Sequence, residues 1–135
     1  WSTDVLIKGR LSVIFTASPK ASIFTDSATT HYPLKDVASH LDENTVINAI
    51  ESAYDAGRYF GRLSPKIAVC GLNPHAGDNG ALGYEEQTII LPAIEKSRKN
   101  NINVYGPFPA DTIYTKAQEW DKFFLCKTIF IFKCF

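Results

Sequence analysis

The chain of 135 residues is long enough for one domain that buries about two-thirds of its unfolded surface. Hydrophobic residues make up 45% of the sequence and charged residues 21%, as is usual for a globular protein. The 14 basic residues equal the 14 acidic residues in number, which argues against nucleic acid or an anionic membrane as the partner. No stretch is typical of a signal peptide or a membrane span, so we expect one domain over residues 1–135 in the cytoplasm.

The three cysteines, Cys70, Cys126 and Cys134, are odd in number and include no CxxC pair. This pattern argues against a disulfide framework and against a cysteine-based zinc site. Cys70 lies within an apolar run, so we expect it to be a small buried side chain.

The amino-terminal part predicts short strands followed by a short helix. Leu11–Ala17 is rich in β-branched and aromatic residues and predicts a strand, and 23–25 predicts a second, shorter one. Tyr32 precedes a proline, which favours extended backbone there. A short helix is expected over 33–41.

A longer helix is predicted over residues 43–60. Asp42 is a suitable amino-terminal cap, and Gly61 is suited to the carboxyl-terminal stop. Apolar residues recur at helical spacing and predict a face that packs on a sheet: Val46, Ile47, Ile50, Ala53 or Tyr54, and Gly57. We expect the aromatic residues Tyr54, Tyr59 and Phe60 to serve core and edge packing rather than ligand binding.

Strands and helices alternate in the second half of the chain. Lys66–Leu72 predicts an apolar strand and 102–105 another, with a helix over 85–99 between them. Pro92 implies either a kink or a regular helix that begins near Leu91. Gly106–Pro109 is expected to form a rigid turn. The alternation predicts an α/β fold with right-handed crossovers.

The tail at 116–135 differs in composition from the rest of the chain, with many Phe, Lys and Ile residues and no glycine. Two interpretations stay open: a final strand of the sheet, or a divergent segment.

Histidines at the ends of two predicted strands are the main candidates for chemistry. Neutral imidazole is the commonest protein metal ligand, so His31 and His75 could converge on one ion. The alternative is two unrelated loop histidines. Asp78 and Asp111 could be further ligands or could orient a histidine, or each could be a solvated carboxylate. His40 lies on a predicted helix and is expected at the surface.

The glycines Gly77, Gly80 and Gly83 precede a predicted helix with the spacing G-x-x-G-x-x-G. Backbone amides of such a loop could bind a phosphate, although the pattern is neither the dinucleotide fingerprint nor a Walker loop. The alternative is that these glycines only form turns.

Three segments resemble the 4-hydroxythreonine-4-phosphate dehydrogenase (PdxA) family of pyridoxal phosphate biosynthesis. They are TTHYPLKDV at 29–37, CGLNPHAGDNGALGYEE at 70–86 and GPFPADTIY at 106–114. They occur in the family's order and at close to its spacing.

The resemblance implies a Rossmann-like α/β/α sandwich of the isocitrate and isopropylmalate dehydrogenase type, working as a homodimer. It implies NAD-dependent oxidation and decarboxylation of 4-phosphohydroxy-L-threonine, a small phosphorylated hydroxy amino acid, to 3-amino-2-oxopropyl phosphate. It further implies a divalent metal, Zn, Mg or Co, bound by three histidines. His31 and His75 match the first two ligands, and Asp111 matches a catalytic aspartate near the metal. No NAD-binding residue can be assigned.

The chain also departs from the family pattern. The family's third histidine lies in a YHDQG segment, whereas no histidine follows His75 here. The stretch SPKASIFTDSA at 18–28 resembles an insertion. Two other interpretations therefore stay open: an inactive fragment of the family that binds metal or dimerises, and a dehydrogenase for a related phosphorylated hydroxy acid.

Overall fold

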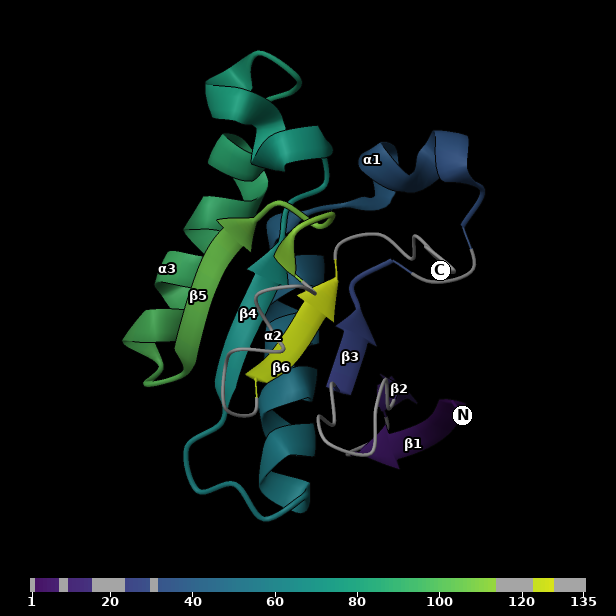
Figure 1. Ribbon diagram of the computed structural model, residues 1–135, viewed down its shortest axis with the longest axis vertical. Coiled ribbons are helices and arrows are strands. Elements are labelled where there is room, and N and C mark those ends of the chain that lie inside the picture. Colours follow the sequence, from purple (N-terminus) through teal and green to yellow (C-terminus); the bar gives the residue numbers. More distant parts are fainter. Residues whose placement is uncertain (1, 8–9, 16–23, 30–31, 114–122, 128–135) are drawn as a thin grey trace.

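The structure, a computed structural model, describes residues 2–7, 10–15, 24–29, 32–113 and 123–127. Its main feature is a parallel four-stranded sheet in the order β3-β6-β4-β5 (Figure 1). The strands are β3 (Phe24–Ser27), β4 (Lys66–Cys70), β5 (Asn103–Phe108) and β6 (Phe123–Lys127). The α/β class with parallel strands, predicted from the alternation of elements, is confirmed.

Strand β6 lies inside the sheet, between β3 and β4. Phe124 pairs with Phe24 on one side and with Ile67 on the other. Of the two interpretations of the tail, the final strand is confirmed for residues 123–127. The neighbouring strand β3 arises from the stretch at 18–28 that resembles an insertion, so part of that stretch belongs to the sheet.

The amino-terminal strands form a separate antiparallel hairpin of β1 (Ser2–Ile7) and β2 (Arg10–Phe15). The expected strand at Leu11–Ala17 is found one residue earlier, and residues 16–17 lie outside the described ranges. Strand β1 was not expected. Its Val5-Leu6-Ile7 run pairs residue by residue with β2. In the sequence this run is only a short apolar segment, and pairing with β2 extends it into a strand.

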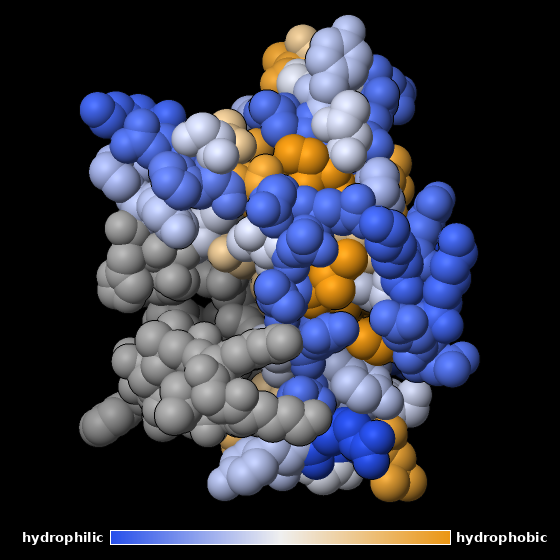
Figure 2. Space-filling view, turned by 180° about the vertical axis from the view of Figure 1, so that it is seen from behind, coloured by the Kyte–Doolittle hydropathy of each residue, from blue (hydrophilic) through white to orange (hydrophobic). Residues whose placement is uncertain are grey.

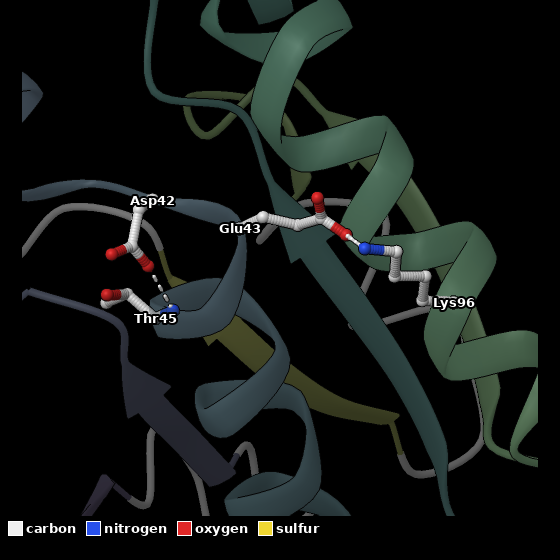
Figure 3. Close-up of polar contacts among 4 residues, drawn as sticks. All are labelled: Asp42, Glu43, Thr45 and Lys96. Atoms are coloured by element: carbon white, nitrogen blue, oxygen red, sulfur yellow. Dashed lines mark hydrogen bonds and ion pairs between the residues drawn. The ribbon is translucent and has the colours of Figure 1, made fainter.

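Helix α2 (Glu43–Tyr59) begins and ends where its capping residues predict. The Asp42 carboxylate accepts a hydrogen bond from the backbone N–H of Thr45 at 2.7 Å (Figure 3), and Gly61 follows the helix with φ +84°. Before α2, a 3₁₀ turn (η1, Leu34–Asp36) and helix α1 (Val37–His40) replace the single short helix expected over 33–41.

The π-helical turn η3 (Glu86–Ile90) leads into helix α3 (Leu91–Lys99). Pro92 stands in the first turn of α3. The second of the two expectations for this proline is therefore confirmed. Glu43 at the start of α2 forms an ion pair with Lys96 of α3 (Figure 3).

The core lies between the sheet and helices α2 and α3, which pack side by side on one face. Fully buried residues from both helices and the strands meet there: Val46, Ile50, Ile67, Val69, Ile90, Ile94 and Val104. Seen from the helix side, hydrophilic residues cover most of the outer surface, with hydrophobic groups showing between them (Figure 2). None of the helices in the described ranges is long and apolar enough to cross a membrane.

Two expectations about aromatic and turn residues are corrected. Tyr54 packs against the core, but Tyr59 is 71% exposed and Phe60 is 42% exposed, because both lie at the end of α2 beyond the sheet. Gly106, Pro107 and Phe108 belong to β5 rather than to a turn. A register shift opposite Ala68 and Cys70 lets the strand continue past the proline.

Candidate active site

Three loops leave the sheet at the same edge. The parallel strands β3, β4 and β5 all end there, followed by Ala28, Gly71 and Pro109 respectively (Figure 1). Ligands of open α/β sheets bind at the carboxyl ends of the strands. The three family-like segments, at 29–37, 70–86 and 106–114, therefore lie at the carboxyl ends of these three strands, on the same side of the sheet.

The loop after β4 carries His75 in an unusual backbone conformation. His75, Ala76, Asp78 and Asn79 have φ values of 53°, 54°, 42° and 55°, and Gly77 has φ 80°. Each left-handed residue other than glycine costs about 1–2 kcal/mol. A run of them persists only where surrounding contacts determine it, and such strain is concentrated at functional sites.

The side chain of His75 is exposed and has no hydrogen-bond or ion-pair partner among the described residues. Its ring nitrogens are therefore available to an external group. Cys70, five residues earlier, is 1% exposed, as expected for a small buried side chain.

A buried carboxylate holds the beginning of this loop. Glu86 is only 3% exposed, and its Oε1 accepts a hydrogen bond from the Asn73 backbone N–H at 2.7 Å. The Asn73 side-chain Nδ2 donates to Glu86 Oε2 at 3.0 Å and to Glu85 Oε2 at 2.7 Å. Sequence reasoning assigned no role to Asn73 or Glu86, because a glutamate at the start of a helix usually faces solvent.

The three glycines of G-x-x-G-x-x-G border protein side chains rather than an open cradle. A Cβ at Gly77 would lie 2.5 Å from Glu86 Oε2, and one at Gly80 would lie 2.7 Å from the Tyr84 ring. A Cβ at Gly83 would overlap Asn73 Nδ2. The glycines thus provide clearance for close packing. Because Glu85 and Glu86 place negative charge at this position, the geometry favours the turn-forming role over a phosphate site.

Asp111 lies on the loop that follows β5, the neighbour of β4 in the sheet. The loop is a turn in which the Ile113 N–H donates to the Pro109 carbonyl at 3.1 Å. Asp111 is exposed and, like His75, has no hydrogen-bond or ion-pair partner within the described part of the chain. Gly106 allows the strand to approach β4 closely, since a Cβ there would lie 2.5 Å from the Val69 carbonyl oxygen.

The remaining candidates differ in their surroundings. His31 lies outside the described residues, two positions after the buried Thr29. His40 is a surface residue as expected: its ring stacks on Tyr32 with centroids 4.1 Å apart, and its Nδ1 lies 2.8 Å from the Asp36 carbonyl oxygen. Asp78 is exposed on the left-handed turn.

The family resemblance implies a divalent metal, for which the described residues offer few donors. Within the described residues, no three His, Cys, Asp or Glu side chains lie close enough to hold a metal ion. His75 is a suitable donor there, since its imidazole is exposed and unpaired, and Asp78 and Asp111 are exposed carboxylates that do not complete a three-residue cluster with it. The described residues therefore supply separate candidate ligands, not a complete metal site.

The sequence matches the family described as Pyridoxal phosphate biosynthetic protein PdxA over residues 6–126. The chain belongs to the PdxA family. The 4-hydroxythreonine-4-phosphate dehydrogenase of Erwinia tasmaniensis is 48% identical over 88 residues, which are 64% of this chain and 27% of the relative. The chain thus spans about a quarter of the length of this PdxA relative.

Solved PdxA-like structures agree with the fold. The crystal structure of 4-hydroxythreonine-4-phosphate dehydrogenase from Klebsiella pneumoniae superposes with a TM-score of 0.76 at 31% identity, covering 85% of this chain and 34% of that one. A terephthalate 1,2-cis-dihydrodiol dehydrogenase from Burkholderia xenovorans LB400 superposes with a TM-score of 0.69 at 27% identity, covering 81% and 34%. The chain is therefore homologous to oxidoreductases.

Proposed function

We propose that this chain carries part of the active site of a NAD-dependent dehydrogenase of pyridoxal phosphate biosynthesis. The reaction is oxidation of the secondary alcohol of 4-phosphohydroxy-L-threonine, followed by loss of CO₂ from the β-keto acid to give 3-amino-2-oxopropyl phosphate. The observation that carries the proposal is the unpaired, exposed His75 at the carboxyl end of β4, in the loop with the family-like NPHAG sequence.

In this proposal His75 and His31 are two ligands of a divalent cation, Zn, Mg or Co. When bound, such a cation polarises the alcohol and then the ketone oxygen as a Lewis acid. Asp111 is the proposed catalytic residue, a free carboxylate on the neighbouring loop that can accept the proton of the substrate hydroxyl. The buried sheet beneath the loops gives these groups a rigid base.

The NAD site has no candidate among the described residues, because the glycines before η3 border Glu86, Tyr84 and Asn73 side chains. We assign NAD binding to parts of a PdxA protein that this chain does not span. The proposal also includes the Rossmann-like α/β/α sandwich, the homodimer with a cytoplasmic location, and one domain over 1–135, whose 116–135 tail diverges from the family in sequence although it contains strand β6. Of this sandwich the described ranges contain one helical layer, because helices α2 and α3 both pack on the same face of the sheet.

Calorimetric titration with Co²⁺ or Zn²⁺ tests the metal ligands. Replacing His31 or His75 with Ala should weaken binding by at least about tenfold, because each removes a direct ligand. His40→Ala is the matched control, since His40 is exposed but stacks on Tyr32, and it should bind as wild type. Equal affinity in all four proteins would refute the metal site.

A second candidate is a family fragment that binds metal or dimerises without catalysis. The absence of a histidine between His75 and Phe135 favours it, since the part of the sequence that follows GPFPADTIY should carry the third ligand. Incubating the chain with NAD and 4-phosphohydroxy-L-threonine separates the two: NADH absorbance supports the enzyme, and metal binding without NADH supports the fragment.

A third candidate is a related dehydrogenase with another substrate. The likeness to a terephthalate 1,2-cis-dihydrodiol dehydrogenase, whose name indicates a different substrate, supports it. Oxidation of a different phosphorylated hydroxy acid, with none of 4-phosphohydroxy-L-threonine, would favour this candidate over the first.

A further inference from the structure

A buried carboxylate joins the two ends of the His75 loop. Glu86 accepts hydrogen bonds from both the backbone and the side-chain nitrogens of Asn73, thirteen residues earlier. Among the described residues it has no other polar partner, and it is almost completely buried. A buried charge is costly unless its oxygens are hydrogen-bonded, so Asn73 and Glu86 hold each other in one arrangement.

The loop is wrapped closely around this carboxylate. A Cβ at Gly71 would lie 3.0 Å from Glu86 Oε1, and one at Gly77 would lie 2.5 Å from Glu86 Oε2. These glycines stand on either side of His75, at positions four before and two after it. Backbone therefore passes the Glu86 oxygens both before and after the histidine, with no room for a side chain.

The left-handed conformation of residues 75–79 needs such a support. His, Ala, Asp and Asn do not adopt consecutive left-handed angles on their own. Of the bonds that close the loop, Ala76 N–H donates to the Asn73 carbonyl at 3.2 Å and Leu82 N–H to the Gly77 carbonyl at 3.1 Å. Both acceptors belong to residues that contact Glu86.

We propose that Glu86 is a positioning residue for His75. By fixing Asn73 and the backbone at Gly77, it sets the direction in which the imidazole leaves the carboxyl end of β4. This effect of Glu86 on the loop does not depend on what His75 binds. Its consequence for metal binding rests on the proposed function of His75.

Glu86→Gln tests the proposal, with Glu85→Gln as the matched control. Both variants remove one negative charge from adjacent residues. In Glu86→Gln, the introduced amide directs an NH₂ group at a nitrogen donor of Asn73, which removes a charge-assisted bond in a buried site. Glu85 is only half-buried and makes a single bond to the same side chain.

Amide hydrogen exchange reads the loop directly. In Glu86→Gln, exchange at Asn73, Ala76 and Leu82 should rise by about tenfold or more, while β4 amides keep the wild-type rate. The Cε1–H signal of His75 should shift. Glu85→Gln should change exchange by less than about threefold. Wild-type exchange and an unshifted His75 signal in Glu86→Gln would overturn the proposal.

A Co²⁺ titration and a second variant distinguish failure of the positioning role of Glu86 from failure of the ligand role of His75. Co²⁺ affinity should fall by about tenfold in Glu86→Gln, with a changed visible absorption band, and stay near wild type in Glu85→Gln. If His75→Ala leaves Co²⁺ binding unchanged, the ligand role of His75 fails while the exchange data still decide the positioning. If Glu86→Gln does not fold, Asn73→Ala replaces it, and wild-type exchange at Ala76 and Leu82 there would refute the proposal.

Discussion

Helix α2 and the loop at 73–83 precede and follow strand β4, and they are stabilised in opposite ways. The helix is defined by residues near its own ends. The Asp42 carboxylate caps the first turn by accepting a hydrogen bond from the Thr45 N–H, and Gly61 terminates the last turn. The loop is defined by Glu86, which reaches Asn73 across thirteen positions and supports backbone angles that its residues disfavour. Helix α2 thus follows local rules, whereas the candidate site depends on one distant side chain.

The largest effect is expected from a substitution in the parallel sheet, because helix α2 and the loop at 73–83 both depend on it. Leu125→Pro removes a backbone N–H from β6, which has strands on both sides, so no position of this proline spares a ladder bond. We expect a loss of at least about 3 kcal/mol in the free energy of unfolding by urea. Leu125→Val is the control for the change of side chain. If the two variants unfolded at one midpoint, β6 would not be an interior strand.

A smaller effect separates the two regions directly. Gly61 and Gly77 have nearly the same φ, +84° and +80°, but a Cβ at Gly61 meets nothing within 4 Å. Gly61→Ala should therefore cost only the backbone strain, about 1 kcal/mol. Gly77→Ala should cost about 2–4 kcal/mol, because its methyl group also displaces the Glu86 carboxylate. Equal unfolding midpoints would contradict the support that we assign to Glu86.

The same contrast explains what the sequence could predict. The limits of α2 and the place of Pro92 follow from capping and backbone rules that act within one helical turn. The strand predicted over 66–72 follows from its apolar run and is found over 66–70, and the position of His75 beyond a strand end follows as well. These features need no knowledge of distant residues.

Other features depend on partners that lie far away in the sequence. Positive φ at the four non-glycine residues between positions 75 and 79 contradicts their local preferences. A buried Glu86 resembles, in sequence, a charge on a solvated helix face. Strand β1 and the interior place of β6 emerge only through pairing. The convergence of His31 with His75 stays a prediction, since His31 lies outside the described residues.

The smallest effect on stability is expected at the amino-terminal cap of α2, the helix that is defined by local residues. The Thr45 backbone N–H holds the pKa of the Asp42 carboxyl below its ordinary value. At pH 7, Asp42→Ala should lower the melting temperature by roughly 2–6 °C, whereas Asp42→Asn, which keeps a capping oxygen, should lower it less.

The pH dependence of that cap shows whether its charge contributes. Because the folded-state pKa of Asp42 is depressed, the carboxylate stabilises the fold fully above the unfolded-state pKa. That contribution is lost as the pH falls through the lower, folded-state value. Scanning calorimetry should therefore find the gap between wild type and Asp42→Asn shrinking in acid. If the difference in melting temperature stays constant or widens in acid, the cap acts through its hydrogen bond alone. The charge of Asp42 would then not contribute to the stability of α2.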